Sequence, residues 1–129
     1  MGKIEDLVMR NNAAFSRGDA EGALAGWNPG GVLKPLPGGK SYRGRDEILA
    51  FMTKEIYEIP EFDFRIYSVL EQRDLAIVFG RYSVSERGVI IDKGIFWILE
   101  VRDDEVVVFE AFENVGEAFA EFKQRLDSR

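Results

Sequence analysis

The 129-residue chain contains no cysteine and no histidine. Without cysteine it forms no disulfide and offers neither a thiolate nucleophile nor a zinc–sulfur site. Without histidine it lacks the commonest general base and the commonest metal ligand. Phosphate-binding loops, nucleophile elbows and metal-spacing motifs are also missing from the sequence. We therefore expect a protein that uses no metal ion and no cofactor.

Positive charge and long apolar runs are also scarce. The formal net charge of −6 argues against a protein that follows nucleic-acid phosphates. No apolar run reaches the length that spans a bilayer, and the first residues, MGKIEDLVMR, alternate charged with apolar side chains, unlike a signal peptide. The sequence predicts a soluble, cytoplasmic protein without nucleic-acid or membrane partners, and its length suits a single domain over residues 1–129.

Hydrophobic periodicity predicts helices in the first half of the chain and strands in the second. A helical stripe carries Ile4, Leu7, Val8, Asn11 and Phe15, and a second short helix after Asp19 ends at Trp27. A third helix is expected over 45–59. After Pro60 the repeat changes to two residues, which predicts strands near 62–71, 75–87, 90–102 and 106–113, then a helix after Asn114. This order is typical of an α+β domain with an antiparallel sheet.

The middle strands are apolar on both faces. Ile95, Trp97 and Leu99 alternate with Phe96 and Ile98. Since the helices cover only one face, we expect a second copy of the chain to cover the other. The predicted homodimer interface is centred on Phe79, Phe96, Ile98 and Phe112. The alternative is a partly exposed face made more polar by neighbouring charged residues.

The segment WNPGGVLKPLPGG, residues 27–39, contains three of the four prolines and four of the thirteen glycines. No aspartate or glutamate occurs from Trp27 to Arg45, and Lys34 is the only ionisable side chain of residues 27–39. Proline and glycine suit a short, bent strand. We expect this segment to shape a site without transferring protons.

FSRGD at 15–19, a short helix, and then YRGRDEI at 42–48 resemble the SnoaL-like polyketide cyclase and ketosteroid isomerase group of the nuclear transport factor 2-like superfamily. The resemblance covers nearly the whole chain. It implies a cone-shaped, strongly curved antiparallel sheet wrapped around N-terminal helices, a pocket between them and a short C-terminal helix. Dimers are common in that group. Its fold hosts isomerases, cyclases, dehydratases, epoxide hydrolases and binders, so it does not define a function.

The resemblance also permits a comparison of catalytic positions. Ketosteroid isomerases use an aspartate base and an oxyanion hole made by a tyrosine and a protonated aspartate. The positions that match the tyrosine and the protonated aspartate hold Asn11 and Trp97, and the base position falls on Lys34 or Pro35. These residues argue against the standard isomerase mechanism.

Other residue types still suit a binding pocket. The predicted ligand-binding residues are Asn11, Trp27, Lys34, Tyr82, Trp97 and Phe109. Asn11 and Tyr82 are expected to hold a ligand oxygen. Alternatively, Asn11 is a core residue that bonds to backbone or water, and Tyr82 reaches solvent at the rim of the pocket. Lys34 is expected to pair with Glu113 or an anionic ligand, or else to lie on the surface.

Glu113 is the candidate acid or base. It lies at the end of its strand and is expected to point to the same inner face as Phe109, because alternate residues of a strand share a face. Burial there would raise the pKa of its carboxyl group.

Three functions remain open. The first is a mostly apolar pocket that binds a small lipophilic or aromatic molecule. The second is a cofactor-free cyclase, dehydratase or isomerase that uses Glu113. The third is a non-catalytic dimeric accessory domain whose interior is filled by its own aromatic side chains.

Overall fold

The computed structural model describes residues 2–129. The chain begins with helices α1 (Lys3–Ser16) and α2 (Ala20–Ala23), followed by strands β1 (Trp27–Lys34) and β2 (Tyr42–Arg43), helix α3 (Arg45–Phe51) and a π-helical turn, η1 (Met52–Ile56). Strands β3 (Asp63–Gln72), β4 (Leu75–Glu86), β5 (Val89–Arg102) and β6 (Glu105–Phe112) follow, and helix α4 (Val115–Asp127) ends the fold.

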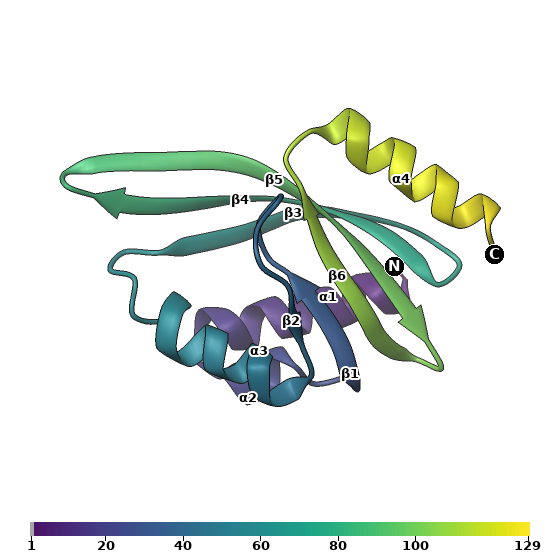
Figure 1. Cartoon of the computed structure of the whole chain (residues 1–129), viewed down its shortest axis with the longest axis horizontal. Helices are drawn as coiled ribbons and strands as arrows, with labels where there is room; N and C mark the ends of the chain where they lie inside the picture. Colours follow the sequence, from purple (N-terminus) through teal and green to yellow (C-terminus); the bar gives the residue numbers. More distant parts are fainter. Residues whose placement is uncertain (1) are drawn as a thin grey trace.

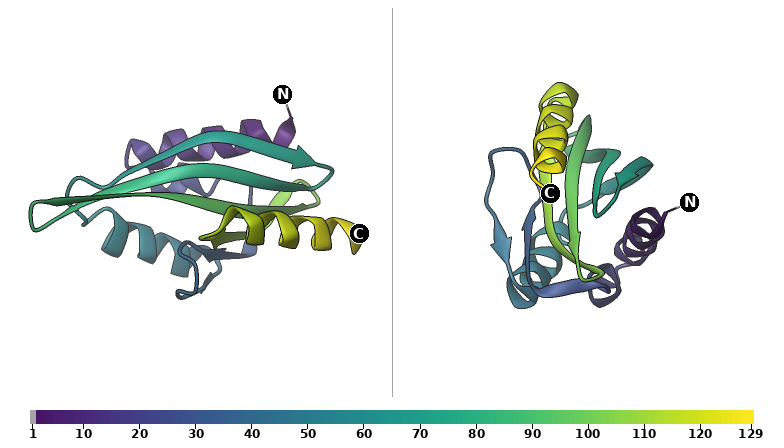
Figure 2. Two further views of the ribbon diagram at one scale, coloured as in Figure 1. Left: turned by 90° about the horizontal axis from the view of Figure 1, so that it is seen from above. Right: turned by 90° about the vertical axis from the view of Figure 1, so that its right-hand side faces the viewer.

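One strongly curved six-stranded sheet organises these elements, in the order β2-β1-β6-β5-β4-β3. The helices α1, α2 and α3 lie on its inner side, and α4 lies on its outer side (Figures 1 and 2). The predicted α+β cone is therefore confirmed. The sheet is mixed in one place, because β1 pairs with β6 in parallel while the other pairs are antiparallel.

Two helical boundaries differ from the prediction. The second helix ends at Ala23, and Trp27 begins β1 opposite Val106. Gly26 between them adopts φ 83°, a left-handed conformation that turns the chain out of the helix. The third helix is α-helical to Phe51 and then continues as the wider π-helical turn.

The Pro/Gly segment forms a strand with a large bulge. Trp27 pairs with Val106 and Val32 with Val108, so the residues between Trp27 and Val32 bulge out of the ladder. A β-carbon at Gly31 would lie 3.1 Å from the Asn28 backbone oxygen and 3.2 Å from that of Val106. Glycine therefore fits closely where the bulge folds back against β6, and a larger residue would press on both backbone oxygens.

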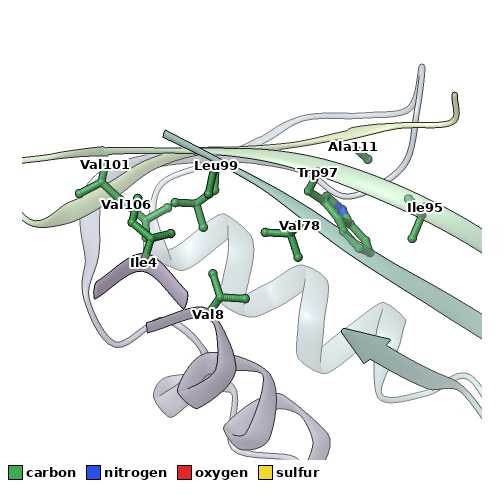
Figure 3. Close-up of a cluster of buried hydrophobic side chains, with 10 residues drawn as sticks. Ile4, Val8, Val78, Ile95, Trp97, Leu99, Val101, Val106 and Ala111 are labelled. Carbon is green, nitrogen blue, oxygen red and sulfur yellow. The ribbon is translucent and has the colours of Figure 1, made fainter. Parts of the chain in front are cut away.

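The main core lies between α1 and the inner face of the sheet. Ile4 and Val8 of α1 point toward Val78, Trp97 and the other apolar side chains of β4, β5 and β6 (Figure 3). The start of α1 is fixed to β3, because the Glu71 carboxylate accepts a 2.9 Å hydrogen bond from the Glu5 backbone N–H. An acid at this end also suits the helix dipole.

The outer face is covered in part by the chain's own C-terminal helix. Phe122 of α4 packs on Leu75, Ile77 and Ile98, and Ile98 is 0% exposed. Ile98 is thus buried inside the protomer and cannot lie at the centre of a dimer interface, contrary to the prediction. Phe79, Phe96 and Phe112 remain half-buried beside the helix.

Ion pairs hold α4 in place. The Arg125 guanidinium lies 3.0 Å from a carboxylate oxygen of Glu100 and 2.6 Å from one of Glu110. Arg129 lies 2.6 Å from Glu100 and 2.9 Å from Asp74. Glu100 and Glu110, two of the charged residues on this face of the sheet, therefore attach a helix to it.

Phe122→Ala is expected to lower the free energy of unfolding by about 3–5 kcal/mol, because it removes the side chain that seals α4 to the sheet. Val115→Ala is the control, since Val115 is on the same helix but 42% exposed, and should cost under about 1 kcal/mol. Urea denaturation of both variants measures the difference. Equal losses would contradict this role for α4.

Candidate functional site

A cavity of about 420 Å³ lies between the inner face of the sheet and the helices. Its wall is almost wholly apolar, and its polar side chains are Asn11, Asn12, Glu55 and Tyr82. The apolar wall combines residues from α1, α2, α3, η1, five strands and the loops next to them: Val8, Phe15, Ala23, Trp27, Leu33, Pro35, Leu36, Phe51, Met52, Ile56, Ile59, Phe62, Phe64, Ile66, Val84, Ile95, Trp97, Leu99 and Phe109.

Aromatic rings form a connected group along this wall. The Trp97 ring centroid lies 4.9 Å from that of Phe64, edge-on, and 5.6 Å from that of Phe109. Phe109 in turn lies 6.1 Å from Trp27. These separations are typical of favourable aromatic pairs. Trp27, Trp97 and Phe109 therefore lie at the cavity as predicted from the sequence, and the chain has no other tryptophan.

The position of Trp97 depends on Gly80, which is opposite Ile95 in the neighbouring strand. A β-carbon at Gly80 would lie 2.9 Å from Cζ3 of Trp97 and 2.6 Å from the backbone oxygen of Arg65. Any larger residue must displace the indole or the β3 backbone. The glycine thus makes room for the ring that forms this part of the wall.

Asn11 lies at the cavity, and its amide is fixed by the backbone. Its Nδ2 group donates to the carbonyl oxygens of Gly22, at 3.2 Å, and Ala25, at 3.0 Å. A side-chain amide has two N–H donors, so both are occupied. Asn11 therefore ties α1 to the α2 region and cannot donate to a ligand carbonyl, one of the roles considered for it. Its Oδ1 atom remains as an acceptor.

Asn12 is a pocket residue that the sequence reasoning missed. Its Oδ1 atom is buried and has no hydrogen-bond partner among residues 2–129. The signal was present, because Ile4, Val8 and Asn12 are spaced by four residues along one side of α1. An unpaired buried oxygen of this kind costs about 1–3 kcal/mol of stability.

Two further polar groups belong to the cavity wall. Tyr82 of β4 is half-buried and lines the cavity, as predicted. Glu55, on the π-helical turn, is exposed, so the acid of the cavity wall stays in contact with solvent. Burial, and then the nearby Glu55 carboxylate, raise the pKa of the Tyr42 hydroxyl, which keeps that phenol neutral. π-Helical turns often occur at functional sites.

Two predicted site residues lie elsewhere. The Lys34 ammonium is 3.8 Å from a carboxylate oxygen of Glu110, which is on the outer face near Arg125. Glu113 is exposed just beyond β6, outside the cavity wall. The expectation that Glu113 is desolvated against Trp97 and Phe109 is therefore wrong, because the strand ends before this residue.

The Pro/Gly segment contributes Trp27, Leu33, Pro35 and Leu36 to the cavity wall. All four side chains are apolar except for the indole N–H. This agrees with the prediction that the segment shapes a site and supplies no acid. In the part of the chain that the structure describes, no group of three or more Asp and Glu residues is arranged to hold a metal ion. No helix of residues 2–129 has the length and hydropathy to cross a bilayer.

Comparisons with known proteins agree with this architecture. The profile of the SnoaL-like domain matches residues 8–109. A nuclear transport factor 2-like protein of unknown function from Burkholderia pseudomallei K96243 is 22% identical, with 95% of this chain and 98% of that chain covered and a TM-score of 0.78. A nuclear transport factor 2-like protein from Burkholderia thailandensis E264 is 23% identical, with 92% and 98% covered and a TM-score of 0.77.

TerC, co-crystallized with polyporic acid, is 24% identical, with 91% of this chain and 95% of that chain covered and a TM-score of 0.73. At such identities these likenesses concern the fold alone. No curated protein matches the sequence.

Gly80→Ala is expected to lower the free energy of unfolding by about 1–3 kcal/mol and to change the near-ultraviolet circular dichroism of Trp97, because the new methyl group overlaps the indole. Gly94→Ala serves as the control, since the nearest atom to its β-carbon would be an Arg81 guanidinium nitrogen at 3.8 Å. A Gly80→Ala protein with unchanged stability and spectrum would show that Trp97 is not held in this way.

Proposed function

The chain belongs to the SnoaL-like domain family, and on that basis we propose that it binds a small, flat, mostly apolar molecule in the cavity. The observation that carries the proposal is the combination of a cavity of about 420 Å³ with a wall that is almost entirely apolar and aromatic. Ligand pockets in proteins commonly have this size and composition. An interior filled by its own aromatic side chains, as the accessory-domain hypothesis required, would leave no such space.

The positions of the acidic residues favour a binding function over cofactor-free catalysis. Proton transfer between carbons needs an acid or base beside the substrate, with a pKa tuned by its surroundings. Glu113 is outside the cavity wall and Glu55 is exposed. The donors of Asn11 are occupied, so this residue cannot stabilise a developing oxyanion. The cyclase or isomerase alternative therefore has to rely on Tyr82 and Glu55.

The polyporic acid in TerC supports small-molecule binding by this fold. It does not define the ligand of the present chain. That ligand has to fit the residues of this cavity.

Both tryptophans line the cavity, so intrinsic fluorescence reports directly on its occupancy. We expect titration with 4-phenylphenol to change that fluorescence saturably, and native mass spectrometry to detect bound probe. Val84→Phe places a larger side chain in the cavity wall and should weaken binding about tenfold or more, which corresponds to about 1.4 kcal/mol.

Val89→Phe is the control for Val84→Phe, because Val89 is 61% exposed on the β4–β5 hairpin and lies outside the wall. Its affinity should equal that of the natural sequence. If 4-phenylphenol and its methyl ether and carboxylate analogues all fail to bind, or if they bind Val84→Phe as well as the natural sequence, the cavity is not a binding site for such molecules.

We further propose that the chain forms a homodimer through the part of the outer face that α4 leaves open. The ring centroids of Phe79 and Phe96 lie 6.0 Å apart there, and the ring centroid of Phe119 of α4 lies 6.0 Å from that of Phe79. Aromatic residues are enriched in interface cores. With Phe112, these side chains form an apolar patch beside the helix.

Phe96→Glu is expected to produce monomers in sedimentation velocity, because it introduces an unpaired charge into the patch. Ile90→Glu, at a residue 74% exposed on the hairpin, should leave the dimer intact. A monomeric natural sequence at all concentrations would rule out the homodimer.

A further inference from the structure

We propose that a second cavity, beside the one described above, binds a methylated ammonium group. This inference goes beyond the proposed function, because it concerns another class of ligand. The second cavity has a volume of about 240 Å³ and lies between the C-terminal end of α1 and the segment that joins η1 to β3. The two cavities adjoin, because five apolar side chains belong to both walls: Phe15, Ile56, Ile59, Phe62 and Phe64.

Aromatic rings around Phe15 supply π faces to the wall of the second cavity. The Phe15 ring centroid lies 5.3 Å from that of Tyr57 and 6.3 Å from that of Phe62, whose ring plane is nearly perpendicular, at 84°. The Tyr57 hydroxyl donates a 3.1 Å hydrogen bond to the backbone oxygen of Phe15, which fixes the two rings beside each other. Perpendicular rings present π faces in two directions, and the negative face of an aromatic ring attracts a cation.

The charge of this wall has one sign. Glu61 and Asp63 belong to it, and among the described residues no lysine or arginine does. Asp63 is partly neutralised, because its carboxylate lies 2.9 Å from Nε of Arg65. Glu61 forms no ion pair with residues 2–129. An anion would therefore meet like charge in the second cavity, whereas a cation gains an electrostatic partner.

Glu61 occupies a backbone position that favours glycine. It follows Pro60 and adopts φ 57°, in the left-handed region. A proline followed by a left-handed residue is typical of a type II turn, where glycine is usual at the second of these positions. Residues with side chains in this conformation often occur at ligand sites. The turn before β3 thus brings a glutamate to the wall where a glycine would suit the backbone.

A methylated ammonium fits this combination better than a primary ammonium does. A primary ammonium has three N–H donors, and each needs an acceptor when it leaves water. Most residues of the second wall are aromatic or aliphatic. The methyl groups of a quaternary ammonium need no hydrogen bond, so they can contact the rings and the isoleucines while the charge is attracted by Glu61.

Choline and 3,3-dimethylbutan-1-ol test the proposal on the natural sequence. They have the same shape, but the alcohol has a neutral carbon atom in place of the charged nitrogen. We expect choline to bind in the millimolar range and about tenfold more tightly than the alcohol. NMR titration of the backbone amides measures both affinities and should show large shifts at Glu61 and its neighbours. Equal affinities, or no saturable shift with choline, would overturn the proposal.

Two variants with the same change of net charge assign the preference to the wall. Glu61→Gln should weaken choline binding about fivefold, because one carboxylate is lost from the cavity. Glu58→Gln is the matched control, since Glu58 is exposed three residues earlier and outside the wall, and should bind choline like the natural sequence. Equal losses in both variants would show that only the net charge matters and would overturn the site.

A ring variant tests the aromatic part of the wall. Phe62→Leu keeps an apolar side chain but removes a π face, so it should reduce the choline-to-alcohol affinity ratio several-fold. Because this is a ratio of two ligands on one protein, a general loss of folded protein does not change it. An unchanged ratio would contradict the role of the rings.

Val84→Phe separates the two cavities, because Val84 belongs to the wall of the first cavity and not of the second. We expect this variant to bind choline like the natural sequence. A loss of choline affinity in Val84→Phe would place choline in the first cavity and overturn the proposal. Choline binding without binding of 4-phenylphenol would overturn the proposed function of the first cavity and support that of the second.

Discussion

The fold depends on the need to cover β5 on both faces. This strand carries Trp97 and Leu99 toward the inner helices and Ile98 toward α4, and all three side chains are buried. Covering the outer face requires a helix of the right length held at the right place, which Phe122 and the ion pairs of Arg125 provide. Covering the inner face leaves the cavity, because α1 packs closely on the sheet near Ile4 and Val8, while aromatic side chains line the space beyond them.

The inner helix serves two purposes with one sequence stripe. Its apolar residues close the core, and its two asparagines occupy positions where the same stripe reaches the cavity. Asn11 uses its donors to hold the α2 region, so its structural role determines which half of the amide remains for a ligand. In this way the two interpretations considered for Asn11, core residue and ligand residue, are compatible. The structural interpretation limits the ligand interpretation to acceptance of a hydrogen bond.

The helices, the strands and most of the aromatic wall could be predicted because they follow from local periodicity and turn chemistry. Asp103 and Asp104, for example, adopt φ 51° and 64° in the short turn expected between β5 and β6. Glu113 was assigned by counting along its strand, and that count fails because β6 ends at Phe112. Lys34 was assigned from the resemblance, and its side chain instead pairs with Glu110 on the outer face. Glu55 was missed because a π-helical turn changes the angular spacing of side chains. The packing of α4 on Ile98 is a tertiary contact, which the hydrophobic periodicity of the sequence does not predict.

The acid-free Pro/Gly segment connects these features. A strand that bulges between Trp27 and Val32 cannot present side chains at regular intervals, yet it still places Trp27 and Leu33 at the cavity wall. An acid there would face an apolar cavity without a cationic partner and would be neutralised or excluded. Because the segment is apolar, the wall stays hydrophobic, and the segment supplies no group for proton transfer. A cavity of this volume removes packing that would otherwise stabilise the core, and a bound ligand restores part of it. The same absence of charge that argues against an isomerase thus makes occupancy of the cavity by an apolar molecule favourable to the folded state.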